Sequence, residues 1–221
     1  MNWTAAMDGY CERTDPSFWA EPLNAATNAA FLVAAFVMWR RVRGLGLPLA
    51  VAMCVNLAVI GVGSFLFHTF ATGWAATADV LPILVFIMLY LYAVWRDFVG
   101  LGPVAAGIGA VAYLPYAALT VPLFYRVLPW LGSSADYGPV PVLLIAFAIG
   151  LRRKAPQTAR GIGLGALVLL VSLTFRTLDE PLCTVWPHGT HFLWHGLNAV
   201  MLGWMIEVYR RHMLAGRAAR G

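Results

Sequence analysis

Two histidines, His191 and His195, lie four residues apart at the start of the last long apolar segment of the chain. On an α-helix this spacing places both imidazoles on one face, one turn apart. Two imidazoles in this arrangement can bind the same metal ion, and imidazole is a common zinc ligand. Ionisable side chains inside an apolar segment are costly and therefore candidates for function. The alternative is a pair of interfacial histidines that hydrogen-bond to lipid headgroups or neighbouring helices.

A third histidine, His68, ends an earlier apolar segment, and Ser64 lies four residues before it on the same helical face. Asp79 follows at the start of the next apolar segment. Beside a catalytic metal, a carboxylate can take a proton from water and deliver it to a leaving group, and a hydroxyl can stabilise an oxyanion. The structural alternatives are a helix N-cap for Asp79 and a small residue at a helix contact for Ser64.

The elements that must position these residues are membrane helices. Of the 221 residues, 61% are hydrophobic and 11% are charged, whereas about a quarter of the residues in a soluble domain are charged. Most of the long apolar runs approach the roughly 20 residues that a membrane-spanning helix needs. The runs are 23–42, 48–67, 79–96, 103–122, 138–152, 162–178 and 190–209. The sequence therefore predicts one all-α domain over 1–221, a seven-transmembrane helix bundle, with six spans as the alternative. Residues 1–22 are expected to form an acidic segment outside the membrane.

Basic residues predict the orientation of the bundle, because cytoplasmic loops carry an excess of Lys and Arg. With seven spans, twelve of the 15 basic residues fall on the side of the C-terminus. They are Arg40, Arg41, Arg43, Arg96, Arg152, Arg153, Lys154, Arg160, Arg210, Arg211, Arg217 and Arg220. We therefore expect a cytoplasmic C-terminus and an N-terminus outside, in the periplasm or lumen. Because these residues lie between the apolar runs, the net charge of +5 does not indicate a nucleic-acid partner.

This topology brings the three histidines to one membrane depth. The second span ends outside with His68, and the seventh begins outside with His191 and His195. Three histidines leave the fourth position of a tetrahedral zinc open for water, which is the catalytic arrangement.

Acidic residues concentrate on the predicted outer side of the membrane. They are Asp8, Glu12, Asp15, Glu21, Asp136, Asp179 and Glu180. Acidic residues contribute little to topology, so this concentration needs another cause. Binding of a hard cation is one cause, and a solvated acidic tail is the other.

The motifs resemble those of the alkaline ceramidase family. The segments G-x-G-S-x-x-F-H at 61–68, D-x-x-P at 79–82 and H-x-x-x-H at 191–195 are similar to landmarks of a wider superfamily of seven-span membrane hydrolases, which also includes the adiponectin receptors. The N-terminal blocks Tyr10-Cys11-Glu12 and 20–28 resemble the acidic motifs of the ceramidases themselves. The resemblance thus extends over nearly the whole chain.

This resemblance implies a zinc ion bound by His68, His191 and His195, with Asp79 and Ser64 as catalytic partners. It also implies a calcium site in the N-terminal segment. The implied calcium ligands are Asp8, the carbonyl of Tyr10, Glu12 and Glu21. The chain departs from the family pattern at Gly9, where the motif has an aspartate, and at Thr14, where it has an asparagine. Calcium takes six to eight oxygen ligands, so the segment would have to fold back on itself.

Cys11 and Cys183 both fall on the predicted outer side, where an oxidising compartment favours a disulfide between them. Such a bond would tie the N-terminal segment to the loop that leads into His191. Cys54, the remaining cysteine, lies within a span.

Taken together, the sequence and the resemblance predict a zinc-dependent membrane amidase that cleaves the N-acyl bond of ceramide-like lipids, with its site toward the outer side. One alternative is another lipid acyl hydrolase of the superfamily, acting on an ester or on a different N-acyl lipid. A second is a lipid receptor with a structural zinc. A metal transporter is disfavoured because no intramembrane carboxylate or histidine continues the path to the inner face.

Overall fold

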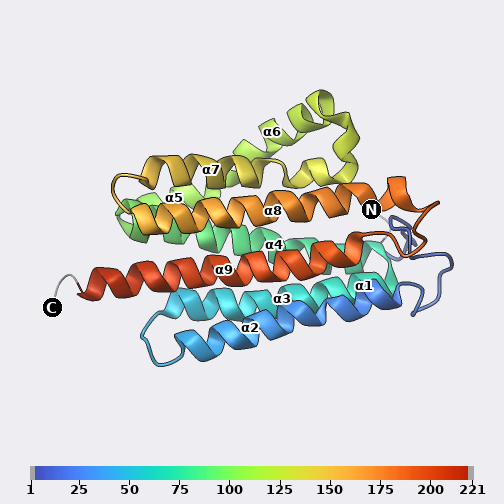
Figure 1. Ribbon diagram of the computed structural model, residues 1–221, viewed down its shortest axis with the longest axis horizontal. Helices are drawn as coiled ribbons and strands as arrows, with labels where there is room; N and C mark the ends of the chain where they lie inside the picture. The colour runs from blue at the N-terminus through green and yellow to red at the C-terminus, as the bar shows by residue number, and fades with distance from the viewer. Residues whose placement is uncertain (1–2, 219–221) are drawn as a thin grey trace.

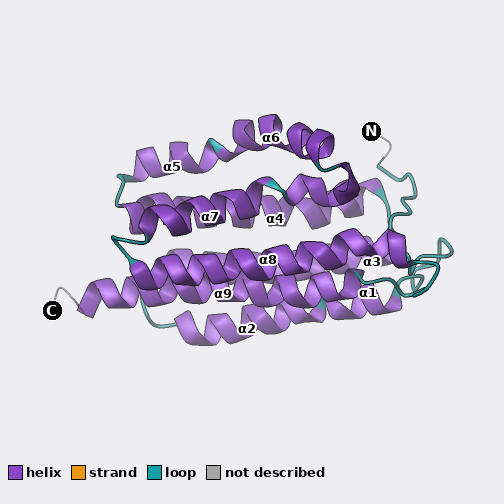
Figure 2. Ribbon diagram, turned by 45° about the horizontal axis from the view of Figure 1, so that its top comes forward, coloured by secondary structure: helices purple, strands orange, loops and turns teal. Residues whose placement is uncertain are grey.

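The computed structural model describes residues 3–218 and consists of helices joined by short connections (Figures 1 and 2). Within the described residues, β pairing is limited to an isolated bridge between Ala6 and Thr72. The predicted all-α class is therefore confirmed. In chain order the elements are α1 Pro22–Thr27, α2 Ala29–Val42, α3 Pro48–Phe70, α4 Gly73–Ala93, the π-helical η1 Val94–Val99, α5 Pro103–Val111, α6 Tyr113–Val127, the 3-10 helix η2 Pro129–Tyr137, α7 Pro139–Leu151, α8 Pro156–Leu182 and α9 His191–Ala218.

Proline marks the beginning of most of these helices. Pro48, Pro103, Pro139 and Pro156 are the first residues of α3, α5, α7 and α8. The first turn of a helix has no intrahelical partner for its N–H groups, so proline costs nothing there and its fixed φ suits the helix. Two spans start earlier than the apolar runs predict: the third run, predicted from 79, belongs to a span of Gly73–Val99, and the sixth, predicted as 162–178, belongs to α8, which begins at Pro156.

Within residues 3–218, five helical spans are long and apolar enough to cross a membrane. They are Pro22–Val42, Pro48–Phe70, Gly73–Val99, Pro103–Val127 and Pro156–Leu182. A sixth is obtained if η2 and α7, which are bent by 63° relative to each other, count as one. The 28-residue α9 is less apolar, because His191, His195, Asn198 and Glu207 interrupt its apolar face. A seventh span and the orientation of the termini stay predictions.

The helices alternate in direction, so their connections gather at two ends of the bundle (Figure 1). The end with the C-terminus holds the connections 43–47, 100–102 and 152–155. Most of the basic residues lie at this end, either in these connections or in the helices next to them. Arg220 is outside the described residues. Glu207 is buried near this end and binds Arg41, Arg210 and Arg211. The opposite end holds the N-terminal segment and the connections 71–72 and 183–190.

Helix α9 lies at the centre of the bundle and contacts α8, α2, α3 and α1. Small residues allow α8 to approach it closely. A Cβ atom on Gly165 would overlap the sulfur of Met205, and one on Gly161 would come within 2.7 Å of Val208. In a membrane, where helices gain little from the hydrophobic effect, such close contacts contribute much of the association. The start of α9 lies beside α1, α3 and α8 and contacts them through Thr27, His68 and Asp179.

Candidate metal centre

The structure brings His68 of α3 together with His191 and His195 of α9. The ring centroid of His68 lies 5.1 Å from that of His191 and 4.7 Å from that of His195, and the latter two are 4.6 Å apart. One ligand nitrogen from each ring lies within 4.8 Å of the other two. A shared zinc ion binds each nitrogen at about 2.0–2.1 Å and so needs the nitrogens within about 4.2 Å of one another, which a small inward movement of the rings provides. Among the described residues these three histidines form the one such group that could hold a metal.

The hydrogen bonds around the rings leave metal-binding nitrogens free. Nδ1 of His195 lies 3.0 Å from the hydroxyl of Thr27, whose own proton is directed to the carbonyl oxygens of Leu23 and Asn24. Thr27 therefore accepts from Nδ1, and Nε2 of His195 keeps its lone pair. That Nε2 and the Nδ1 of His191 are both buried without a hydrogen-bond partner. Orphaned imidazole nitrogens are expensive inside a protein, so the donor set fits a bound metal ion.

Glu21 orients the third ring. Its Oε2 lies 2.6 Å from Nδ1 of His68, and both side chains are buried. A carboxylate on one ring nitrogen fixes the tautomer and makes the other nitrogen a better ligand. Burial raises the pKa of the Glu21 carboxyl, but hydrogen bonds from His68, Arg13 and Asn24 outweigh it and lower the pKa below its ordinary value. Glu21 is therefore a carboxylate that supports the metal centre.

Tyr10 covers the centre from the N-terminal segment. Its ring stacks on His191 at a centroid distance of 3.8 Å and lies 5.1 Å from His68. Burial raises the pKa of its phenol to about 12, so the hydroxyl is protonated at neutral pH. The aromatic ring of Tyr10 thus shields the histidines from water.

Ser64 and Asp79 meet where α3 and α4 approach most closely. A Cβ atom on Gly63 would overlap the carbonyl of Ala78, so only glycine permits this contact. The Ser64 hydroxyl and the imidazole of His68 both interact with the Asp79 carboxylate. The alternative of an N-cap for Asp79 is wrong, because α4 begins at Gly73 and Asp79 lies inside the helix.

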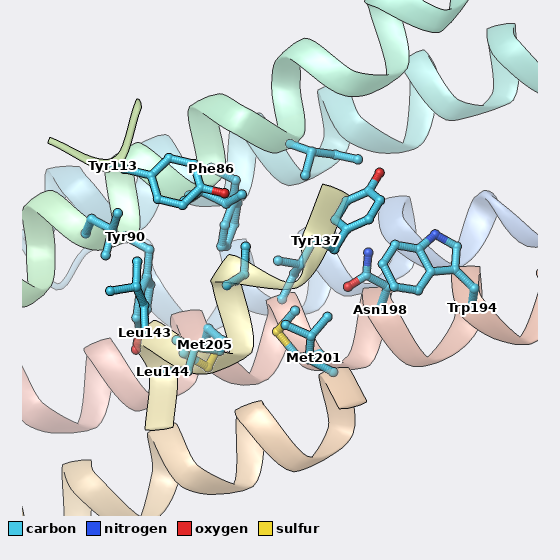
Figure 3. A pocket seen from close by; sticks show the side chains of 16 residues that line it. Phe86, Tyr90, Tyr113, Tyr137, Leu143, Leu144, Trp194, Asn198, Met201 and Met205 are labelled. Atoms are coloured by element: carbon cyan, nitrogen blue, oxygen red, sulfur yellow. The ribbon is translucent and has the colours of Figure 1, made fainter. Parts of the chain in front are cut away.

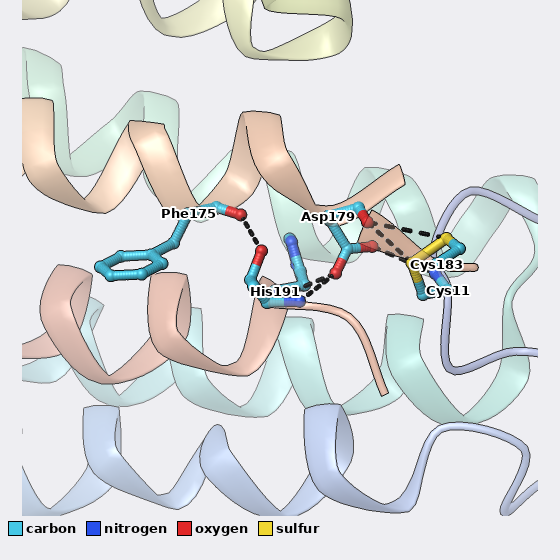
Figure 4. The surroundings of a disulfide bond; sticks show 6 residues. Cys11, Phe175, Asp179, Cys183 and His191 are labelled. Atoms are coloured by element: carbon cyan, nitrogen blue, oxygen red, sulfur yellow. Dashed lines mark hydrogen bonds between the residues drawn. A yellow bond between two sulfur atoms is a disulfide. The ribbon is translucent and has the colours of Figure 1, made fainter. Parts of the chain in front are cut away.

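Asp179 of α8 holds three segments together beside the centre (Figure 4). Its buried carboxylate accepts hydrogen bonds from the backbone N–H groups of Cys11, Thr190 and His191. Two of these donors belong to the beginning of α9, where a negative charge is favourable. The carboxylate also lies against Gly189, which has a φ of +61° and no room for a Cβ atom. Asp179 therefore fixes the position from which His191 enters α9.

The disulfide between Cys11 and Cys183 links the N-terminal segment to the end of α8 at the same point (Figure 4). The backbone N–H of Cys11 also bonds to the Asp179 carboxylate. The disulfide connects residues 172 positions apart, and it keeps Tyr10 next to His191. Cys54 is free and buried.

The structure does not bring the expected calcium ligands together. Both carboxylate oxygens of Glu12 accept backbone N–H groups at the start of α1, from Leu23 and Asn24. Glu21 is bound to Arg13 and His68, and Asp8 is exposed. The residues present do not fit a calcium ion.

Two further residues lie at the site and were not among the predicted site residues, although Thr27 belongs to the 20–28 block. Thr27 orients His195, as described above. Arg176 lies over the rings of Tyr137 and Trp194, 5.1 and 5.9 Å from their centroids, and its Nη1 donates to the hydroxyls of Ser133 and Ser134. The sequence signal that could have identified Arg176 was the position of this charged residue in the sixth predicted span, near the outer end.

A narrow apolar cavity lies between α4, α7, α8 and α9 (Figure 3). Trp194, which directly precedes His195, lies at one end of it, and Tyr90, Leu143 and Met205 lie toward the other. Its volume is about 60 Å³. Met201 and Met205 form part of its wall, and flexible thioether side chains adapt readily to a ligand. The lining has the chemistry of a site for a hydrocarbon chain, but at this volume the side chains must move apart before a long chain can fit.

Comparison with known proteins agrees with this arrangement. No curated protein matches the chain. A family model described as Ceramidase matches residues 4–209, which include all three histidines, Ser64, Asp79 and the N-terminal segment. The match spans nearly the whole chain, and the protein therefore belongs to the ceramidase family.

Proposed function

We propose that this protein is a zinc-dependent integral-membrane amidase that hydrolyses the N-acyl bond of ceramide-like lipids to a fatty acid and a sphingoid base. Membership of the ceramidase family implies hydrolase activity on ceramide. The observation that carries the metal dependence is the group of three buried histidines, two of which have nitrogens without a hydrogen-bond partner.

A zinc ion at this centre would polarise the amide carbonyl and lower the pKa of a water molecule. His68, His191 and His195 would hold it, with Glu21 and Thr27 fixing the rings of His68 and His195. Ordering of ligands by such partners commonly changes metal affinity by about 10–100-fold. The protein therefore supplies a preorganised donor set on rigid helices.

Asp79 and Ser64 perform the proton transfer and the oxyanion stabilisation in this proposal. Asp79 takes a proton from water as the water oxygen bonds to the amide carbonyl carbon. It returns the proton to the amine nitrogen when the C–N bond breaks. Ser64, which interacts with Asp79 in this structure, turns its single hydroxyl proton to the oxygen on which negative charge develops. Asp79 is half-buried, so a substrate can reach it.

The lipid is expected to place its acyl chain in the apolar cavity and its polar part beside Arg176. Trp194 connects these two features, because it lines the cavity and lies under the guanidinium of Arg176. A bilayer lipid can enter sideways between helices. If the seven-span topology holds, the centre faces the outer, periplasmic or lumenal, side of the membrane.

The Leu143→Trp variant is expected to shift acyl-chain preference toward short chains. Leu143 lines the cavity toward the end remote from Trp194, so a larger side chain there shortens the space for hydrocarbon. Each CH₂ excluded from an apolar site costs about 0.8 kcal/mol, and a loss of several methylene groups lowers kcat/KM for a long-chain ceramide by about tenfold or more. The ratio of kcat/KM for N-hexanoyl and N-palmitoyl sphingosine measures the effect.

Leu167→Trp is the matched control, because Leu167 lies on the neighbouring helix α8 and is 57% exposed on the outside of the bundle. It should leave the chain-length ratio unchanged. Equal ratios in Leu143→Trp and the wild type would show that the acyl chain binds elsewhere.

The substrate assignment is tested by incubating the purified protein with ceramide, another N-acyl lipid and an ester lipid, each with and without a zinc chelator. We expect chelator-sensitive release of fatty acid from ceramide. Preferential hydrolysis of an ester would indicate a different lipid hydrolase, and turnover of none of the lipids would indicate a receptor.

A further inference from the structure

Arg13 lies at the point where the N-terminal segment meets the metal centre. Its side chain is only 5% exposed, although an isolated arginine is rarely buried. The sequence places it among acidic residues, between Glu12 and Asp15. Its environment shows why the segment can bury a cation.

The guanidinium group of Arg13 is surrounded by oxygen atoms from separate parts of the chain. Nε donates to Oε1 of Glu21 at 2.6 Å, and Nη2 donates to the carbonyl oxygen of His68 at 3.1 Å. Nη1 lies 3.3 and 3.4 Å from the carbonyl oxygens of Asp15 and Ser17. One carboxylate and three carbonyls form an oxygen-rich set of the kind that calcium prefers. The cation at the centre of this set is the guanidinium group of Arg13.

Two of these contacts act on the same proposed zinc ligand. Arg13 binds the backbone carbonyl of His68 directly, and it binds the Glu21 carboxylate whose other oxygen holds Nδ1 of His68. The backbone and the ring of His68 are therefore both fixed by one guanidinium. A fork of several planar donors suits this task, since arginine is always charged and can contact several oxygens at defined angles.

We propose that Arg13 takes the place of a bound calcium ion, so that the N-terminal segment needs no divalent cation, and that Arg13 is a positioning residue for His68. The calcium part is independent of the reaction, whereas the positioning part rests on the proposed zinc centre. Removing Arg13 leaves the buried Glu21 without its cationic partner, and an unpaired buried charge is strongly destabilising.

The first test titrates calcium into the wild-type protein loaded with zinc. We expect no binding in isothermal titration calorimetry and no change in melting temperature up to millimolar calcium. Stoichiometric binding, or a clear rise in melting temperature, would overturn the proposal. This measurement needs no turnover, so it does not depend on whether ceramide is the substrate.

The second test uses Arg13→Gly, which opens a cavity lined by the same oxygens. We expect zinc affinity to fall about 10–100-fold, as for other losses of a residue that orients a ligand, and the melting temperature to fall. Millimolar guanidinium, and separately calcium, should restore both, since each returns a cation to the cavity. Arg13→Lys keeps a charge but not the planar fork and should have an intermediate zinc affinity.

Arg126→Gly is the control, because Arg126 is an exposed arginine near the same end of the bundle. It should keep wild-type zinc affinity and gain nothing from guanidinium. Wild-type zinc affinity in Arg13→Gly, or equal responses of the two glycine variants to guanidinium and calcium, would refute a positioning role. If Arg13→Gly does not fold, the wild-type calcium titration still decides the calcium part, and the zinc affinity of Arg13→Lys decides the positioning part.

Discussion

The His68→Ala variant is expected to lose bound zinc and ceramide hydrolysis together. His68 is the one ligand that α3 contributes, and the remaining pair on α9 would hold an ion by two nitrogens only. Loss of a residue that merely orients a ligand costs about 10–100-fold in affinity or activity, so loss of the ligand itself should exceed the upper end of that range. Elemental analysis of the purified variant and its hydrolysis rate measure the two effects.

His188→Ala controls for general effects of removing a histidine. His188 lies only three residues before His191, but it is exposed in the connection between α8 and α9. This variant should contain one zinc per chain and hydrolyse ceramide as the wild type does. Full zinc content in His68→Ala would show that the metal binds elsewhere.

The Asp79→Asn variant is expected to keep its zinc and lose turnover. Asparagine has nearly the same shape as aspartate and still hydrogen-bonds to Ser64, but it cannot accept a proton from water. General acid–base groups contribute about 10²–10⁴-fold to rate, so kcat should fall by that amount while KM changes little. Steady-state kinetics together with zinc analysis separate this result from a loss of the metal.

Glu180→Gln is the matched substitution at an exposed carboxylate near the same end of the bundle, and it should leave kcat unchanged. Near-wild-type kcat in Asp79→Asn would exclude Asp79 as the proton acceptor. A receptor would be distinguished by the same variant, because ligand binding without turnover would persist in both Asp79→Asn and the wild type.

The sequence was sufficient to predict which histidines come together. Spacing of four residues places His191 and His195 on one face, and alternation of helices puts the end of α3 beside the start of α9. Both inferences depend on local periodicity and on chain direction, which are readable without coordinates. The centroid separations of 4.6–5.1 Å in the structure agree with both inferences.

The partners of those histidines were not predictable in the same way. Thr27 lies 168 residues from His195, and Glu21 lies 47 residues from His68. Neither pair has a spacing that one helix or one turn would impose. Asp179 was counted only as an outer acidic residue, because its bonds to Cys11 and His191 depend on how the ends of separate elements pack.

The N-terminal segment shows most clearly what the sequence alone does not reveal. A cluster of acidic residues predicts a hard-cation site when the acids are considered alone. In the structure, Arg13 neutralises Glu21, and Glu12 caps the first helix, so the charges are satisfied within the chain. The signal in the sequence was Arg13, a single basic residue within the acidic cluster. Only its burial in the structure reveals its role.

The most direct test of the zinc-dependent amidase is reconstitution of metal-free protein. Purified protein would be stripped with a chelator, dialysed, and titrated with zinc while the release of fatty acid from ceramide is followed. We predict negligible hydrolysis without metal and full recovery at one zinc per chain. Undiminished hydrolysis by protein shown to contain no zinc would contradict the central claim.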